Sequence, residues 1–328
     1  MHNFGAGSPM KSTAVAHRIS IVLVNWNSGP FLERSVLATL ENAAGSEVIV
    51  VDNGSEDASL AFADRLAGRI TTVRNEANLG FAAANNIGWR RSRGELVLFL
   101  NPDAEALPGS VELLSRPLLE DEAIWASAGN LVGPQGAPQV GFNVRAFPTL
   151  GSAFAEAFFL DEIAPRNPWT RKYRASDFDY DSCQDVDQPA AACLMVRRGV
   201  LERLDGFDER FRPAWFEDVD FCRRLRNAGG RIRFVPGARF THHGGSSLRT
   251  LPRGEFLEYF YRNQALYFAK HHGEPAAARV RMLAVAGLRL RAALSLFYPL
   301  VQGSSRVACS RIFWSAAQRV ARARKEDR

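Results

Sequence analysis

Two nucleotide-binding signatures are missing from this sequence. The first apolar run, ISIVLV at residues 19–24, leads into NWNSGP and not into the GxGxxG pattern that grips the diphosphate of nicotinamide and flavin dinucleotides. The GxxxxGK[ST] pattern that cradles the phosphates of ATP and GTP is absent as well. These absences exclude the common dehydrogenase and P-loop classes.

Cysteine is scarce and irregularly spaced. The four cysteines form no CxxC or CxxxC pair that would indicate zinc, and they are too few for a disulfide framework in a chain of 328 residues. This usage favours a reducing cytosol. The cysteines are Cys183, Cys193, Cys222 and Cys309.

Long apolar runs are lacking too. The most lipid-like stretch, MLAVAGLRLRAALSLFYPL from Met282, is broken by Arg289 and Arg291, so we do not expect a membrane-spanning helix. Residues 1–18 mix Gly, Ser, His and Lys without an apolar segment, and we expect a disordered leader there rather than a signal peptide.

Positive charge is concentrated near the C-terminal end. The net charge is +6, yet residues 274–328 alone hold ten arginines and one lysine against three acidic residues, so the remainder is about neutral. Such a tail predicts contact with a membrane surface or a nucleic acid. Only Phe313 and Trp314 lie among the last arginines, too few rings for the base stacking of a single-strand binder. We therefore expect a membrane partner and no nucleic acid.

Short apolar runs alternate with helical patterns in the first third of the chain. Continuous apolar runs separated by helices, one of them expected at 60–66, predict a parallel α/β sheet covered on both faces. Beyond residue 122 the pattern weakens, although IWASAGNLV and RIRFV indicate further strands. The early runs are residues 19–24, 47–51, 70–73 and 96–100.

Polar residues follow each of these predicted strands. Ligands of parallel sheets bind beyond the carboxyl ends of the strands, so these residues are candidates for a binding site. Asp and Asn also start ordinary turns, which is the alternative at each position taken alone. The residues are Asn25, Trp26, Asp52, Asn53, Arg74, Asn75, Asn101, Pro102 and Asp103.

Asp103 is a candidate metal ligand. It directly follows a buried run, and one hard oxygen ligand is enough for Mg²⁺ or Mn²⁺ when a substrate diphosphate brings the others. His242, in the stretch RFTHHGGSS, is the expected second ligand, with His243 as the alternate. Without a metal, Asp103 would cap the helix expected near Pro108, and the two histidines would be inert.

Two further positions suit a nucleotide. Asp52, in VVDNGSEDAS, can accept a hydrogen bond from a nucleobase imide or a ribose hydroxyl, or it can simply cap a turn. Gly80 precedes a small-residue helix whose free N–H groups can receive a phosphate, although alanine-rich helices often follow a glycine without binding one.

Three carboxylates open the expected helix EDVDFCRRLRNA. In a first turn they are stabilised by the helix dipole by ~0.3–1 kcal/mol each, which is a sufficient structural reason for them. Pro213, Trp215 and Phe216 form an apolar rim that we expect to raise the pKa of Asp218 toward that of a general base. From these residues alone, structure and catalysis are equally supported. The acids are Glu217, Asp218 and Asp220.

The C-terminal region is expected to be helical from Glu255. We expect a main domain at 19–272 and a basic amphipathic tail at 273–328. An apolar stripe in the tail, with Arg289 and Arg291 off it, suits an anionic membrane surface. Packing of the stripe on the main domain, or on a second copy in a homodimer, is an equal alternative. The stripe comprises Leu283, Gly287, Leu290, Leu294 and Phe297.

Six stretches spanning about residues 19–247 form a recognisable set. They are ISIVLVNWN, VIVVDNGSEDAS, NEANLGFAAANNIGW, LVLFLNPDAE, GFDERFRPAWFEDVDFCRRLRNAGG and HHGGSS. Taken in this order, they resemble the family 2 glycosyltransferases of GT-A fold, and within them the bacterial rhamnosyltransferase-like branch. The resemblance implies an α/β fold, with a mixed Rossmann-like sheet flanked by helices and a C-terminal helical extension.

The resemblance also implies roles for particular residues. Asn101 stands where the family's DxD element has its first Asp, which leaves Asp103 as the implied metal carboxylate. Asp218 matches the general base of the inverting members, and His242 matches a position that reaches the metal or the diphosphate. The other implied contacts are Val24, Asn25 and Asp52 for the nucleobase and ribose, Asn78 and Gly80 for the diphosphate, and Trp215, Glu217 and Arg262 as support near the acceptor.

The implied activity is inverting transfer of a sugar from a nucleotide diphosphate to a saccharide or lipid-linked acceptor. The expected case is L-rhamnose from dTDP-L-rhamnose in cell-envelope or O-antigen synthesis, on the cytoplasmic face of the plasma membrane. A galactofuranosyl or N-acetylglucosaminyl transferase using a UDP-sugar is the near alternative. A noncatalytic nucleotide-sugar or saccharide binding module of a membrane complex is the alternative of another class.

Overall fold

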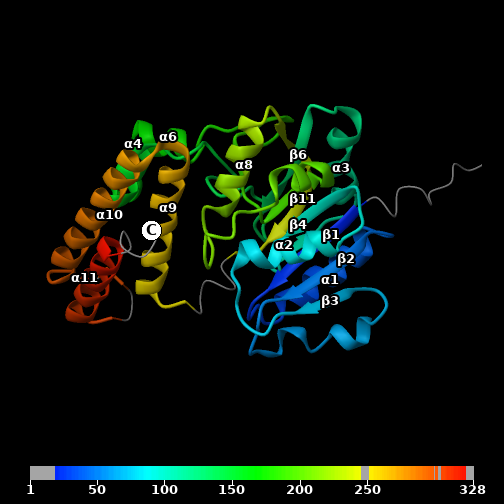
Figure 1. The fold of residues 1–328 in the computed structure, drawn as a ribbon, viewed down its shortest axis with the longest axis horizontal. Coiled ribbons are helices and arrows are strands. Elements are labelled where there is room, and N and C mark those ends of the chain that lie inside the picture. Colours follow the sequence, from blue (N-terminus) through cyan, green and yellow to red (C-terminus); the bar gives the residue numbers. More distant parts are fainter. Residues whose placement is uncertain (1–18, 245–250, 299, 302–303, 323–328) are drawn as a thin grey trace, which may run out of the picture.

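The computed structural model describes residues 19–244, 251–298, 300–301 and 304–322. The leader expected at residues 1–18 lies outside them. In the described chain a mixed β-sheet with helices on both faces forms one end of the molecule, and three long helices stand together at the other end (Figure 1).

Four parallel strands form one half of the main sheet, as the apolar runs predict. Their order is β3-β2-β1-β4. The other half is mixed: β10 is antiparallel to both β4 and β6, and β11 is parallel to β6. The strands are β1 (Ile19–Asn25), β2 (Glu47–Asp52), β3 (Thr71–Arg74), β4 (Leu96–Leu100), β5 (Ala104–Ala106), β6 (Ile124–Val132), β8 (Gln184–Asp185), β10 (Cys193–Arg197) and β11 (Arg231–His242), with β7 (Val144–Arg145) and β9 (Gln188–Pro189) paired separately.

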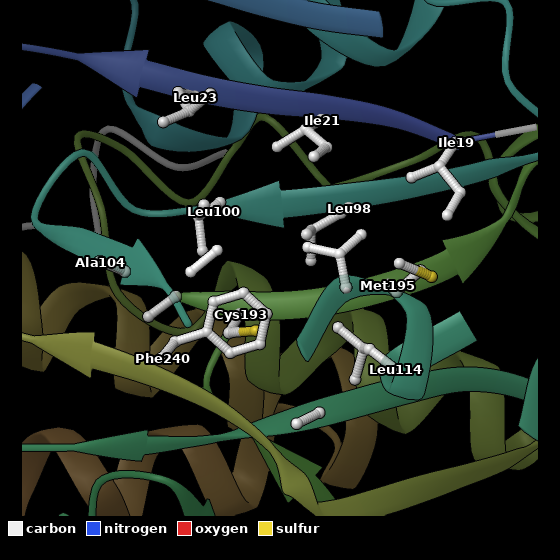
Figure 2. Packing of buried hydrophobic residues seen from close by; sticks show 14 of the residues in the cluster. Ile19, Ile21, Leu23, Leu98, Leu100, Ala104, Leu114, Cys193, Met195 and Phe240 are labelled. Carbon is white, nitrogen blue, oxygen red and sulfur yellow. The ribbon is translucent and has the colours of Figure 1, made fainter. Parts of the chain in front are cut away.

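Alternate residues of each strand point to opposite faces of the sheet, and each face has its own core. Ile21 and Leu23 of β1 face α1 (Phe31–Asn42) and α3 (Ser110–Glu120), and Figure 2 shows their neighbours in this core, among them Leu114 of α3. Val22 faces the opposite core, which is covered by α2 (Phe81–Arg91), α7 (Arg198–Leu204) and α8 (Glu217–Asn227). The prediction of a mixed sheet flanked by helices is confirmed.

The prediction of a helix at 60–66 is wrong. Two short 3₁₀ turns, Ala58–Leu60 and Ala63–Leu66, replace it. The side chain of Asp57 accepts a hydrogen bond from the backbone N–H of Ser59, a local side-chain contact that favours the first of these tight turns over a regular helix.

The C-terminal helices are α9 (Arg253–His272), α10 (Glu274–Ser295) and α11 (Arg306–Arg322). The C-terminal region expected to be helical from Glu255 is therefore divided into three helices, and the described residues between Ser295 and Arg306 are not helical. Leu257 and Tyr261 of α9 share a small core with Leu288 of α10 and Phe313 of α11. Of the short helices, α4 (Leu150–Ala157) lies next to α10 (Figure 1). The helices α5 (Leu160–Ile163) and α6 (Pro168–Tyr173) lie next to α4.

The buried face of α10 differs from the predicted stripe. Gly287 is buried because α10 passes so close to α4 that a Cβ there would lie 2.2 Å from the carbonyl oxygen of Ala157. Arg291 is buried as well and donates hydrogen bonds to the Tyr261 hydroxyl and the Glu156 carbonyl. Most of the stripe instead faces outward, ending in Phe297, which is 78% exposed. No helix within the described residues is long and apolar enough to cross a bilayer.

Candidate functional site

The carboxyl ends of β1 and β2 bring Asn25 and Asp52 together. Parallel register places the two residues side by side, and the Asn25 amide donates to Asp52 Oδ1 at 2.8 Å and to Ser59 Oγ at 2.8 Å. Both side chains are buried. Val24 lies in the core beneath them, so its side chain has little surface to offer a ligand. The structure thus gathers these three sequence-predicted residues at one sheet edge.

Asn53 joins this edge to the segment that precedes α2. Its amide nitrogen donates to Asn78 Oδ1 at 2.8 Å, and its amide oxygen accepts from the backbone N–H of Leu79 at 3.0 Å. Asn78 Oδ1 also accepts from the N–H of Gly80 at 2.9 Å. Asn53 therefore organises the predicted diphosphate segment, and its signal in the sequence is its position directly after a strand.

Gly80 is fixed by a close backbone contact. Its φ is +92°, and a Cβ at this position would lie 2.9 Å from the carbonyl oxygen of Pro213. The N–H of Phe81, the first of α2, donates to that same oxygen at 2.7 Å. One of the N–H groups expected to receive phosphate is therefore already bonded to the loop at residues 212–216.

The metal-ligand candidates Asp103 and His242 lie next to each other. Antiparallel pairing of β11 with β5 sets His242 opposite Ala104, and His242 Nε2 lies 3.3 Å from Asp103 Oδ1. Both side chains are buried. His243 turns away and contacts Glu105 Oε1 at 2.9 Å. Among the described residues, no third His, Cys, Asp or Glu completes a three-residue group around them.

This pair fits a divalent cation. The Nε2 atom of His242 is buried and has no hydrogen-bond partner among the described residues. An imidazole nitrogen beside a carboxylate oxygen is a ligand set that Mn²⁺ accepts, and substrate oxygens and water can complete the coordination. Asn101, the other DxD position, donates its backbone N–H to the carbonyl of Ala192 at 3.0 Å.

The three acids at the start of α8 lie in different environments. Asp220 is fully buried, and its carboxylate lies 2.8 Å from both His271 Nε2 and Lys270 Nζ. Burial alone would raise the pKa of Asp220, but the His271 hydrogen bond and the Arg224 charge hold it below its ordinary value. Glu217 is also buried, and burial together with the neighbouring Asp218 charge raises its pKa well above the ordinary range. Of the three, only Asp218 is partly exposed.

Asp218 has the raised pKa that its surroundings predict. Burial raises the pKa of its carboxyl, against hydrogen bonds from the backbone N–H groups of Val219 and Ala191 and the positive charge of Arg145. Ala191 and Ala192 link the two halves of the site, because Ala191 contacts Asp218 while Ala192 accepts from the backbone of Asn101. These two contacts connect the start of α8 with the segment after β4 that carries Asp103.

A left-handed corner precedes Asp218. Trp215 and Phe216 both have positive φ, +74° and +72°, a conformation that non-glycine residues rarely adopt. Phe216 packs in a core with Phe260 and Tyr267 of α9. Of the residues predicted to form an apolar rim, Trp215 packs against Phe256 of α9 and Phe216 is buried against the same helix.

Arg262 and Asn263 of α9 hold this corner from outside. The Arg262 guanidinium donates to the carbonyl of Arg212 at 2.7 Å, and the buried Asn263 amide donates to the carbonyls of Ala214 at 2.8 Å and Trp215 at 3.2 Å. The sequence motifs predicted that this part of α9 lies near the site, but they did not predict that it holds the loop before α8. Arg145 of β7 also escaped sequence reasoning, because it lies in a loop-rich stretch without a recognisable pattern.

Comparison with known proteins identifies related chains. The model of the family described as "Glycosyl transferase family 2" matches residues 20–202. The chain is 31% identical over 293 residues to the N-acetylglucosaminyl-diphospho-decaprenol L-rhamnosyltransferase of Mycobacterium tuberculosis, covering 84% of this chain and 92% of the relative.

Two further proteins are similar over a smaller share or in fold alone. The rhamnosyltransferase WbbL of Escherichia coli K12 is 30% identical over 179 residues, which are 51% of this chain and 63% of that protein. The crystal structure of GalNAc-T7 with UDP, GalNAc and Mn²⁺ superposes with a TM-score of 0.56 at 18% identity, covering 78% of this chain and 50% of that one. The last comparison shows a shared fold.

Proposed function

This chain belongs to glycosyl transferase family 2, and from that premise we propose that it transfers L-rhamnose from dTDP-L-rhamnose, with inversion, to a lipid-linked saccharide of the cell envelope. Glycosyltransferase activity follows from the family. The observation that carries the choice of sugar and acceptor class is the 31% identity to a rhamnosyltransferase over 92% of that relative's length.

The donor site in this proposal is the edge formed by β1, β2 and the segment before α2. Asp52 would accept from the nucleobase or ribose, with its orientation fixed by Asn25. Asn78 and Gly80 would lie along the diphosphate, held by Asn53. Polar groups that are already bonded to each other lose little freedom when a ligand binds.

Asp103 and His242 would hold a Mg²⁺ or Mn²⁺ ion. When bound, such an ion acts as a Lewis acid that stabilises the negative charge developing on the leaving diphosphate. His243 is not part of this set, because its ring contacts Glu105 and the guanidinium of Arg34.

Asp218 would act as the general base. As the acceptor hydroxyl oxygen bonds to C1 of the sugar, its proton passes to the Asp218 carboxylate, and the bond between C1 and the diphosphate oxygen breaks. One carboxylate suffices for this single displacement, which inverts the anomeric carbon. Trp215, Glu217 and Arg262 would support the acceptor side, Arg262 through the loop that it holds.

Donor binding is tested by thermal unfolding with dTDP, UDP and GDP, each with and without Mn²⁺, because a ligand that binds only the folded chain raises the midpoint. We expect the largest shift with dTDP and Mn²⁺. A larger shift with UDP would favour the galactofuranosyl or N-acetylglucosaminyl alternative. Asp218→Asn should keep the dTDP shift and lose transfer; a fully active variant would remove Asp218 as the base.

The C-terminal helices suggest where the enzyme works. Apolar side chains are exposed near the end of α10 and on α11, among them Phe297, Leu294 at 43% and Trp314 at 50%, with Arg289 stacked 5.7 Å from the Trp314 ring. Exposed apolar and cationic groups together suit an anionic bilayer surface. We propose peripheral binding to the cytoplasmic face of the plasma membrane through this tail.

Flotation of the full chain with phosphatidylglycerol-containing vesicles tests the tail. The double change Leu294→Ser and Phe297→Ser should reduce co-flotation, whereas Leu119→Ser, an equally exposed leucine on α3, should not. Added salt should weaken binding, since exposed charges are screened. Concentration-dependent dimerisation that the same double change abolishes, without flotation, would instead assign the surface to a homodimer.

A further inference from the structure

One side chain outside the motifs holds both the backbone and the ring of His242. Gln139, in the loop after β6, donates from its amide nitrogen to the carbonyl oxygen of His242 at 2.7 Å. Its amide oxygen lies 2.8 Å from His242 Nδ1. The ring of Phe142 stacks on the imidazole, with centroids 5.0 Å apart and planes 10° from parallel. The imidazole is thus fixed in position on several sides.

These contacts determine which ring nitrogen carries the proton. A backbone carbonyl can only accept, so the amide nitrogen of Gln139 must face it, and the amide oxygen must then face Nδ1. An amide oxygen also only accepts, so Nδ1 is the protonated nitrogen. In the neutral ring the lone pair is therefore on Nε2, the buried atom without a hydrogen-bond partner that lies 3.3 Å from Asp103 Oδ1.

We propose that Gln139 is a positioning residue that fixes His242 in the tautomer whose Nε2 lone pair faces Asp103, so that this lone pair is presented to a divalent cation held by the two side chains. This inference rests on the metal site of the proposed function. Metal-bound histidines commonly donate their second N–H to an outer acceptor, and loss of that acceptor typically weakens metal binding by about 10- to 100-fold. Gln139 provides such an acceptor and in addition restrains the backbone.

Two substitutions separate the hydrogen bond from the space that the side chain fills. Gln139→Met keeps the length and removes both hydrogen bonds, whereas Gln139→Glu keeps an acceptor for Nδ1–H and removes the donor to the carbonyl. Gln135→Met is the matched control, because Gln135 is an exposed glutamine of the same loop. All variants are made in the full chain, and their unfolding midpoints are compared to confirm folding.

The first measurement is the ring tautomer in the metal-free protein, from ¹H–¹⁵N correlations of the histidine side chains at a pH where the rings are neutral. The His242 signals are assigned by their loss in His242→Gln, among six histidines in the chain. We expect the proton on Nδ1 in the wild type, in Gln135→Met and in Gln139→Glu, and a shift toward Nε2 in Gln139→Met. A wild-type proton on Nε2, or an unchanged tautomer in Gln139→Met, would overturn the inference.

The second measurement is the apparent Mn²⁺ dissociation constant in the presence of dTDP, from the electron paramagnetic resonance signal of unbound Mn²⁺, corrected for the Mn²⁺–dTDP complex without protein. Gln139→Met should raise it about 10- to 100-fold, and Gln139→Glu should not. Equal constants in Gln139→Met and the wild type would refute the role of Gln139 alone. Absence of protein-bound Mn²⁺ in the wild type would refute the metal site and, with it, this inference.

Discussion

Asn263 on α9 donates a hydrogen bond of 2.8 Å to the backbone carbonyl of Ala214, only four residues before the candidate base Asp218. The same amide reaches the carbonyl of Trp215, whose backbone is left-handed. A residue in the C-terminal third of the chain therefore restrains the turn that directs α8 into the site.

Replacing Asn263 by Leu should destabilise the protein and slow transfer. The side chain is fully buried, and its removal leaves backbone carbonyls without a donor, at a cost of ~1–3 kcal/mol. We expect a lower urea midpoint and, under conditions where the variant is folded, a lower kcat because Asp218 is less well placed. Gln318→Leu, at an exposed amide on α11, is the control and should change neither. Wild-type kcat in folded Asn263→Leu would restrict Asn263 to a structural role.

Gly80→Ala should be strongly destabilising, whereas Gly199→Ala should not. At Gly80 the φ of +92° is strained for alanine, and the added Cβ would collide with Pro213, at a cost of at least ~1–3 kcal/mol. Gly199 lies in α7 with open space around its Cβ position, where alanine is favoured. Chemical denaturation of both variants measures the difference. Equal stability of the two would show that the contact between Gly80 and Pro213 relaxes easily.

Glu217→Gln should stabilise the protein increasingly as pH rises. The pKa of Glu217 is raised in the folded chain, so the folded state holds its proton more tightly than the unfolded state does. Stability from this group is present below the unfolded pKa near 4.5 and is lost as pH rises toward the folded pKa. Glutamine has no such loss, so the difference in melting temperature between variant and wild type should grow from about pH 5 upward. A pH-independent difference would contradict the assignment.

Arg145→Gln should move the acidic limb of the activity profile to higher pH. A general base must be ionised, so kcat/KM falls as pH drops through its pKa, which for Asp218 is raised by burial above the ordinary 3.8. The Arg145 charge opposes that increase, so its removal should raise the pKa of Asp218 further and shift the acidic limb to higher pH. Arg116→Gln, on the exposed side of α3, should leave the profile unchanged. A limb that does not move in Arg145→Gln would show that Arg145 does not influence the base.

Local pattern predicted the parallel half of the sheet and the residues at its edge, because strand periodicity and strand ends are readable over a few positions. Asn25, Asp52 and Asp103 were found in this way. The pairing of β10 between β4 and β6 was not predicted, since strand order depends on contacts between distant segments. Gln139 was missed for the same reason: it acts on a residue about 100 positions away and carries no motif. Asn263 adjoins Arg262, a predicted support residue, but its hydrogen bonds to the loop before α8 join segments about 50 positions apart and were not predicted.

The helix α9 has two attachments: its outer residues share a core with α10 and α11, and its Arg262 and Asn263 clamp the loop before α8. Chimeras that exchange the C-terminal helices should therefore have their junction ahead of Arg253. A junction at Gly273 would pack foreign helices against Leu257 and Tyr261 of α9, and a displaced α9 would disturb the loop before α8.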